Sequence, residues 1–329
     1  MAQSGTQGLQ KHWYRITPLH LLLLPLSLLF YLLSTIRRLL FKSRILASIK
    51  LPVPVIIVGN ISVGGTGKTP FTLWLAEQLI SNGWHPGIIS RGFGGSGNTP
   101  QEVLPNSDPA LAGDEPVLMA QRKLCPVWVS RNRPAAALSL LKAHPECDVI
   151  LSDDGLQHYR LQRDVEIVVV DGVRRFGNGF LLPAGPMRET PGRLRNVDAV
   201  VINGGQAAAG EFAMQLEGVH FYNLLNPEIT ATAAEFMGLS IHALAGIGHP
   251  ERFFQHLKNL GLTLKTHAFP DHHAYTATDL TYPEANALLM TEKDAVKCIG
   301  FADEKCWVLR VEAHLDSALI PLILKKISR

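Results

Sequence analysis

The sequence is poor in residues that form covalent or metal-held cross-links. Its four cysteines form no C-x-x-C pair and no cysteine–histidine cluster with zinc spacing; they are Cys125, Cys147, Cys298 and Cys306. Disulfide scaffolds and structural zinc sites need such patterns, so the sequence argues against both. A reducing compartment is the expected environment.

Charge is also scarce, and it is unevenly placed. Charged residues make up 18% of the 329 residues and hydrophobic residues 47%, which excludes a disordered chain and favours about two domains. No acidic residue precedes Glu77, whereas eight lysines and arginines do. The remaining chain carries 23 basic and 28 acidic side chains, so it has no basic surface typical of nucleic-acid binding. We expect neither a nucleic-acid partner nor an obligate protein partner.

Residues 19–36 form an uncharged run with ten leucines. A helix of eighteen residues spans about 27 Å, close to the ~30 Å thickness of the membrane hydrocarbon. Basic residues lie on both sides of the run: Lys11, Arg15, Arg37, Arg38, Lys42 and Arg44. Lysine and arginine beside an anionic leaflet favour membrane attachment, and the sequence predicts attachment of residues 1–50 to a membrane surface.

Several modes of attachment compete. A cleaved signal peptide fits badly, because arginines rather than small residues follow the apolar run. A spanning helix would put the C-terminal body in the cytoplasm. A helix lying in the inner leaflet is favoured slightly by Pro25 and by the basic residues on both sides. The alternative without a membrane is a buried core helix.

The rest of the chain predicts two α/β units. Apolar, β-branched segments that read as strands are residues 53–59, 87–90, 127–129, 148–152, 165–171 and 199–202, with helices expected over 68–81 and 134–143. This alternation predicts a doubly wound parallel sheet over residues 51–225. After residue 225 the pattern restarts. Strands are expected at 243–248, 263–269, 287–291 and 307–311 and a helix at 250–260, giving a smaller α/β domain over 226–329.

A phosphate-binding loop follows the first strand. The segment runs Ser62-Val63-Gly64-Gly65-Thr66-Gly67-Lys68-Thr69. Backbone amides of such a loop hold phosphates, the lysine reaches the β- and γ-phosphates, and the threonine hydroxyl binds Mg²⁺. The usual pattern begins with glycine, and Ser62 replaces it. The strand before the loop and the helix after it still favour an ATP–Mg²⁺ site over an ordinary glycine-rich turn.

The loop alone allows a kinase, a transport ATPase or a GTPase switch. A GTPase needs N-K-x-D and D-x-x-G, and neither is present; Thr291-Glu-Lys-Asp294 comes near the first but has its lysine one place late. A small-molecule phosphotransferase therefore leads. The alternative is a membrane-tethered ATPase or GTPase switch that acts on a protein partner.

Carboxylates and histidines provide candidate chemistry. Asp153 and Asp154 end an apolar strand, where a P-loop enzyme places its Mg²⁺-orienting aspartate. Asp114 precedes an apolar helical pattern and suits either a helix cap or a general base. His272 lies in Pro270-Asp-His-His273, which suits acid–base work or a solvated turn. Spacing alone decides neither case.

Basic loops are candidates for contact with a substrate. Arg91 lies in Ser90-Arg-Gly-Phe-Gly-Gly95, a flexible loop that suits phosphate binding or plain solvation. Arg133 and Arg188 lie near predicted strand ends. Arg188 and Glu189 also close an apolar turn over residues 180–189, which we interpret as facing the substrate.

In combination these segments resemble the tetraacyldisaccharide 4′-kinase family of lipid A biosynthesis. The segments that carry the resemblance are V-G-N-I-S-V-G-G-T-G-K-T-P, S-R-G-F-G-G, A-G-D-E-P-V-L, D-D-G-L-Q-H, V-V-V-D-G-V-R-R-F-G-N-G, L-P-A-G-P-M-R-E, G-I-G-H-P-E-R-F-F, D-H-H and M-T-E-K-D-A-V-K. They run in order from about residue 53 to residue 298. The family's loop also lacks the leading glycine, while Phe93 stands where the family more often has tyrosine.

The resemblance implies transfer of the γ-phosphoryl group of ATP to the 4′-hydroxyl of a lipid-linked glucosamine disaccharide 1-phosphate, giving lipid IVA. It implies that Asp114 and His272 act as a catalytic dyad beside Asp271, and that Asp153 and Asp154 organise Mg²⁺ and the phosphates. It also implies two domains that close over the substrate, at the cytoplasmic face of the bacterial inner membrane.

Overall fold

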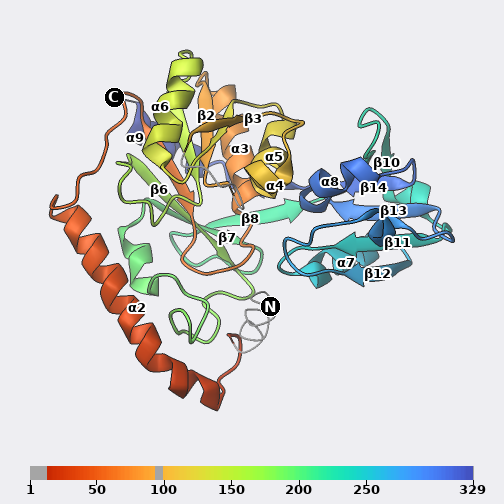
Figure 1. Cartoon of the computed structure of the whole chain (residues 1–329), viewed down its shortest axis with the longest axis horizontal. Coiled ribbons are helices and arrows are strands. Elements are labelled where there is room, and N and C mark those ends of the chain that lie inside the picture. The colour runs from red at the N-terminus through yellow and green to blue at the C-terminus, as the bar shows by residue number, and fades with distance from the viewer. Residues whose placement is uncertain (1–12, 93–98, 329) are drawn as a thin grey trace.

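The computed structural model describes residues 13–92 and 99–328, so Phe93 and the glycines after it lie outside the described residues. Two β-sheets stand side by side, and one long helix, α2 (Pro18–Lys42), runs along the outside of the larger unit (Figure 1). The predicted class, a P-loop kinase-like α/β fold with a smaller α/β unit and an N-terminal apolar helix, is confirmed.

The larger sheet has nine strands in the order β15-β8-β7-β6-β1-β5-β2-β4-β3. All neighbours are parallel except the edge pairs β15–β8 and β3–β4. The strands are β1 (Val55–Gly59), β2 (Pro86–Ser90), β3 (Gln101–Val103), β4 (Val127–Val129), β5 (Val149–Asp153), β6 (Val165–Asp171), β7 (Ala199–Asn203), β8 (Phe212–Glu217) and β15 (Glu312–Leu315). The central strand β1 is buried along its whole length, as an apolar parallel strand covered on both faces must be.

Helices cover both faces of this sheet. One face packs against α3 (Lys68–Ser81), α5 (Asp114–Gln121) and α9 (Leu319–Ile327). The other face packs against α6 (Arg133–Ala143) and the chain around Leu156 and Leu161. The doubly wound arrangement places the carboxyl ends of β1, β5 and β6 at one edge, where ligands bind in such sheets.

The smaller sheet has six strands in the order β10-β9-β14-β13-β11-β12. They are β9 (His220–Asn223), β10 (Thr230–Thr232), β11 (Ile241–Ala245), β12 (Leu264–Ala268), β13 (Ala287–Thr291) and β14 (Cys306–Leu309). Helices α7 (Pro250–Asn259) and α8 (Glu292–Cys298) flank it. Short helices complete the described chain: α4 (Pro109–Ala112), η1 (Pro191–Asn196), η2 (Ala233–Phe236), η3 (Ala277–Leu280) and η4 (Ile299–Phe301).

The expected domain boundaries, 51–225 and 226–329, need correction at both ends of the smaller unit. Its sheet begins with β9 at His220. At the other end the chain returns to the larger unit, because β15 pairs with β8 and α9 buries Leu319 and Ile323 in the larger core. The apolar pattern of a helix shows that it has a buried face, but not which sheet covers that face.

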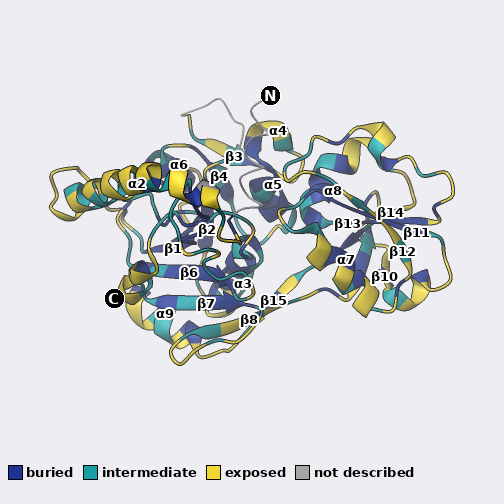
Figure 2. Ribbon diagram, turned by 90° about the horizontal axis from the view of Figure 1, so that it is seen from below, coloured by how far each residue is buried: buried dark blue, intermediate teal, exposed yellow. Residues whose placement is uncertain are grey.

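Helix α2 is confirmed in position and is longer than the apolar run that predicts it. It docks through polar side chains: Ser27 Oγ donates to the Leu181 carbonyl at 2.9 Å, and the His20 ring nitrogen Nε2 lies 3.0 Å from Asn178 Nδ2. Only 11% of its apolar stretch is buried, so the interpretation as a core helix is wrong. Among the described residues it is the one helix long and apolar enough to cross a membrane, and most of its surface is exposed (Figure 2).

Candidate active site

The phosphate-binding loop connects β1 to α3, as the sequence predicts. Gly67, at φ +90°, precedes the first residue of α3, Lys68. Gly64 also has a positive φ, and a side chain at either position would be strained. The loop is pinned to the segment before Glu189, because Val63 N donates to the Pro186 carbonyl at 2.8 Å and Arg188 N donates to the Ile61 carbonyl at 2.7 Å.

Two residues that sequence reasoning did not select hold the far side of this loop. Asn203 Nδ2, at the end of β7, donates to the Thr66 carbonyl at 3.0 Å. Arg174 Nη2 donates to the Gly65 carbonyl at 2.7 Å, while its Nε donates to Asp171 Oδ2 at 2.9 Å. Arg174 follows β6, which neighbours β1, and Asn203 ends β7, the next strand beyond β6. Their places at the carboxyl ends of these strands are the signal that would have found them.

Asp154 lies at the centre of a cluster of cations beside the loop. Lys68 Nζ is 3.5 Å from Asp154 Oδ1, and Arg188 Nη1 is 3.1 Å from both oxygens of the same carboxylate. Burial by itself raises the pKa of Asp154, but Lys68 and Arg188 outweigh it, so this pKa lies well below its usual range. The structure therefore brings together three of the predicted site residues and keeps Asp154 ionised.

Asp153 occupies the more buried position of the pair. It is fully buried at the end of β5, and Thr72 Oγ1 lies 3.4 Å from its Oδ1. No donor among the described residues reaches its buried Oδ2 atom. Burial, reinforced by the charge of Glu115, raises the pKa of Asp153 to about 7. A buried carboxylate oxygen that lacks a donor calls for a cation or a proton.

Asp114 and His272 are brought into contact across the junction of the two sheets. Asp114 is the first residue of α5, and His272 lies in the loop after β12. His272 Nδ1 is 3.0 Å from Asp114 Oδ2. His272 has φ +59°, a backbone conformation that is costly for a residue other than glycine. On its other side, His272 Nε2 lies 3.8 Å from Asp271 Oδ2.

This pair lies close to the phosphate-binding loop. A Cβ added at Gly248, in the loop before α7, would lie 3.6 Å from both the Gly65 nitrogen and Asp271 Oδ2. Arg252 of α7 also reaches Asp171 Oδ2 at 3.2 Å, on the edge that holds the loop. The smaller unit therefore contacts the nucleotide end of the larger one. His273 faces elsewhere, with its Nε2 3.3 Å from Asp279 and its ring stacked on Phe269.

The three arginines predicted to contact the substrate differ in location and burial. Arg188 is in the cluster around Asp154, and Arg91 is exposed just after β2. Arg133 is only 1% exposed, and its guanidinium donates to the carbonyls of Ser130 and Asp153 at 3.1 and 3.0 Å. This burial contradicts the expectation that Arg133 contacts the substrate. It holds the ends of β4 and β5 together instead.

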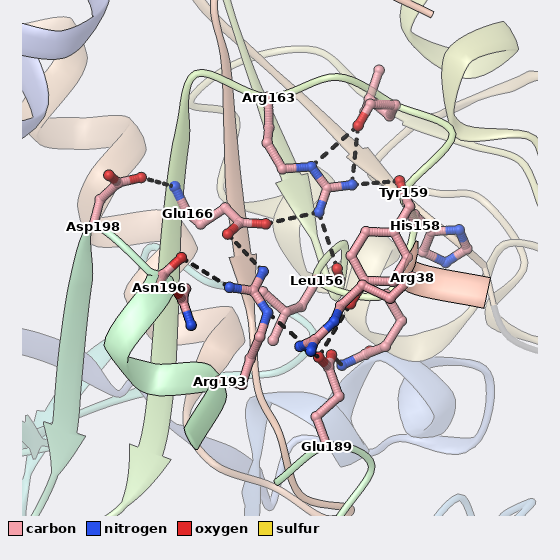
Figure 3. Close-up of polar contacts among 12 residues, drawn as sticks. Arg38, Leu156, His158, Tyr159, Arg163, Glu166, Glu189, Arg193, Asn196 and Asp198 are labelled. Carbon is pink, nitrogen blue, oxygen red and sulfur yellow. Dashed lines mark hydrogen bonds and ion pairs between the residues drawn. The ribbon is translucent and has the colours of Figure 1, made fainter. Parts of the chain in front are cut away.

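Side chains of the protein itself, and not a free surface, surround the Glu189 carboxylate with hydrogen-bond donors and cations (Figure 3). Gln157 Nε2 donates to Glu189 Oε1 at 2.8 Å, and the Tyr159 hydroxyl donates to Oε2 at 3.1 Å. Arg193 Nε lies 3.4 Å from the same carboxylate, and Arg38 of α2 lies 4.0 Å from it. These contacts fix Glu189 as a link between α2 and the loop after Asp154, a role that its sequence position did not reveal.

Comparison with known proteins then assigns the family. The chain matches the family described as tetraacyldisaccharide-1-P 4'-kinase (LpxK) over residues 19–328. The chain belongs to this kinase family. Two curated relatives named tetraacyldisaccharide 4'-kinase are similar over nearly their full length. That of Methylobacillus flagellatus is 53% identical, covering 100% of this chain and 98% of the relative, and that of Dechloromonas aromatica is 51% identical, covering 97% of each.

A solved structure agrees with the family assignment. The crystal structure of LpxK from Aquifex aeolicus in complex with ATP matches with a TM-score of 0.80 and 32% identity, covering 94% of this chain and 99% of the other. The resemblance read from the motifs is thus confirmed, and the protein is a kinase of the lipid A pathway. A P-loop switch acting on a protein partner is not favoured.

Proposed function

We propose that this kinase transfers the γ-phosphoryl group of ATP to the 4′-hydroxyl of a membrane-borne tetraacyl glucosamine disaccharide 1-phosphate. The observation that carries the proposal is the contact of Asp114 with His272 beside the phosphate-binding loop. A P-loop binds the nucleotide, and a partly buried acid–base pair beside it supplies the proton acceptor that an attacking sugar hydroxyl requires.

In this proposal the loop residues 62–69 hold the nucleotide phosphates through their backbone amides. Lys68 and Arg188 bring positive charge to the place where the phosphoryl group moves, which is the main catalytic contribution in phosphoryl transfer. Asp154 holds both cations in position through its two oxygens. Arg91 is an exposed cation at the same edge and is proposed to contact an anionic group of the substrate.

Asp114 is proposed to accept the proton of the 4′-hydroxyl, with His272 orienting the carboxylate and sharing the proton. Burial by itself raises the pKa of Asp114, but the His272 hydrogen bond and the charges of Lys297 and Lys293 outweigh it. The pKa of Asp114 is therefore lowered, and the residue is a carboxylate at neutral pH. It is ready to accept a proton without first losing one.

The residues beside the loop fit Mg²⁺. The Asp153 Oδ2 atom is buried and has no donor in the part of the chain that the structure describes, and Thr69 is the threonine that follows the P-loop lysine. The described residues hold no group of three or more His, Cys, Asp or Glu side chains placed for a metal ion. That agrees with magnesium, which is commonly held by one or two carboxylates together with substrate phosphates. Thr69 and Asp153, with Asp154 nearby, would hold the ion, which would neutralise phosphate charge.

Helix α2 is proposed to bring the active site to the membrane surface. Eight of its leucines are exposed, and its basic C-terminal end lies toward Glu189 and the loop after Asp154. The body of the protein contacts α2 at Ser27 and again near Phe41, whose ring lies 6.1 Å from that of Tyr159. Contacts at both places favour a helix that lies along the surface over one that crosses it. The cytoplasmic face of the inner membrane is the proposed location, because ATP is there.

The decisive experiment supplies the purified protein with Mg-ATP and a tetraacyl disaccharide 1-phosphate in mixed micelles. We expect a product phosphorylated at the 4′ position, identified by mass spectrometry and phosphorus NMR. Lys68→Ala should abolish turnover, because the β- and γ-phosphates lose their fixed cation. Lys258→Ala, on the exposed side of α7, is the matched control and should retain activity. Phosphorylation at another position, or full activity of Lys68→Ala, would refute the proposal.

A further inference from the structure

Helix α8 carries several charged contacts between the two units. In the reaction proposed above, this helix enters only through the charges of Lys293 and Lys297, which lower the pKa of Asp114. It follows β13 in the segment Thr291-Glu-Lys-Asp-Ala-Val-Lys297. Three ion pairs join it to α5, the helix that begins with Asp114, and to Arg122, the residue that follows this helix. They are Lys297 with Asp114 at 3.8 Å, Lys293 with Glu115 at 3.5 Å and Glu292 with Arg122 at 2.9 Å.

Lys297 is the buried member of this set that touches the acid–base pair. Its side chain is 9% exposed, and its ammonium lies between Asp114 Oδ2 and Asp294 Oδ1, the latter at 3.2 Å. The ammonium also lies 5.0 Å from the centre of the Tyr275 ring, whose face favours a cation. Burying a lysine is costly unless its charge is compensated, and here two carboxylates and an aromatic ring compensate it.

Asp294 fixes the position of this lysine. It is fully buried, and three donors hold its carboxylate: the Thr291 hydroxyl at 2.6 Å, the Tyr275 hydroxyl at 3.1 Å and the Gly246 amide at 3.2 Å. These donors come from the end of β13, from the loop after His272 and from the residue that follows β11. Asp294 is therefore held by three hydrogen bonds within the smaller unit. Its ion pair with Lys297 places that ammonium against Asp114 of the larger unit.

Asp114 is ionised because neighbouring donors and cations lower its pKa. The titratable or charged groups around it come from α5, from the loop after β12 and from α8; they are Glu115, Asp271, His272, Lys293 and Lys297. The two lysines lie four residues apart on α8, so they share one face of that helix. Lys293 Nζ is 3.5 Å from His272 Nε2 and 3.1 Å from Asp271 Oδ1, on the far side of the histidine ring.

We propose that Lys297 is a positioning residue for the Asp114–His272 pair: held by Asp294, its ammonium fixes the Asp114 carboxylate against His272 across the junction. This inference rests on the proposed function, since it assigns Asp114 the role of proton acceptor. Lys297 acts through Asp114 and need not touch the substrate. The hydrogen bonds that hold the buried Asp294 carboxylate also fix the place of the Lys297 ammonium beside it.

The test compares Lys297→Met with wild type over a range of pH. The methionine keeps most of the volume and removes the charge. We expect kcat to fall about 10- to 100-fold through misplacement of the carboxylate, with little change in KM for ATP. Because an opposite charge is lost, the pKa of Asp114 rises, and the acidic limb of the kcat–pH profile should move upward by about 1 unit. Lys258→Met, exposed on α7 of the same unit, should change neither quantity.

Two further variants keep the test decisive. Lys297→Arg retains the charge but not the shape of the side chain, so kcat should fall while the acidic limb of the kcat–pH profile stays in place. This variant tests the inference even if Lys297→Met does not fold. In an Asp114→Asn background, Lys297→Met should cause no additional loss of kcat, because Lys297 acts through Asp114. Wild-type kcat and pH profile in Lys297→Met, or a full additional loss in the double variant, would overturn the inference. Absence of kinase activity in the wild type would instead refute the proposed function.

Discussion

The pairing of Asp114 with His272 predicts a specific pattern of losses in a double-mutant cycle. Asp114→Asn keeps the shape of the side chain and removes its ability to accept a proton, and His272→Ala removes the partner 3.0 Å away. Loss of a general base typically costs ~10²–10⁴ in rate, which corresponds to about 2.7–5.5 kcal/mol of transition-state stabilisation. Each single variant should fall in this range, with the affinity for ATP nearly unchanged.

The double variant separates a catalytic unit from two independent residues. If the residues act together, the double variant should be barely slower than either single variant, and the coupling energy should approach one full single loss. Independent action would instead multiply the losses to roughly 10⁴–10⁸. The geometry predicts strong coupling, because one contact joins the two side chains and they lie on different units of the molecule.

The assay is kcat at saturating Mg-ATP with the lipid disaccharide in mixed micelles, with KM for ATP measured separately. His273→Asn is the matched control, because this neighbouring histidine contacts Asp279 and stacks on Phe269 instead of joining the pair. Its kcat should stay close to that of wild type. Losses at Asp114 and His272 that simply multiply would refute the reasoning, and Asp114 would then be only the first residue of α5.

Two further predictions concern the membrane side of the molecule. Deleting residues 1–44 should release much of the protein from membranes and impair use of the lipid substrate while leaving the α/β fold intact, as judged by cooperative unfolding of the truncated protein; full retention on membranes in a flotation assay would place the main attachment elsewhere. Tyr159→Phe removes a hydrogen bond to the Glu189 carboxylate and should lower the free energy of unfolding by about 1.5 kcal/mol. An unchanged denaturant midpoint would show that Gln157 and Arg193 hold Glu189 without help.

The local elements of the site could be predicted because their signals are local. The phosphate-binding loop is a run of glycines and one lysine between an apolar strand and a helix, and the structure places it between β1 and α3. The Asp153–Asp154 pair follows an apolar strand and lies where β5 ends. Backbone conformation and strand burial depend mostly on nearby residues, so such motifs can be read from the chain.

The sequence was less informative about which side chains are accessible. The sequence predicts that Arg133 and Glu189 contact the substrate, yet Arg133 is buried and Glu189 is enclosed by Gln157, Tyr159 and Arg193. A charged side chain can be buried when donors or acceptors converge on it. Their convergence depends on segments far apart in the chain, so composition gives no sign of it.

The sequence by itself determined the α/β class, the P-loop, the apolar N-terminal helix and, through the ordered motifs, the family. Only the tertiary structure decided that β15 and α9 return to the larger sheet, and that Asp114 meets His272 although 158 residues separate them. Both results depend on how the two sheets pack. Packing minimises exposed apolar surface and unpaired charge over the whole molecule, so no short segment of sequence specifies it.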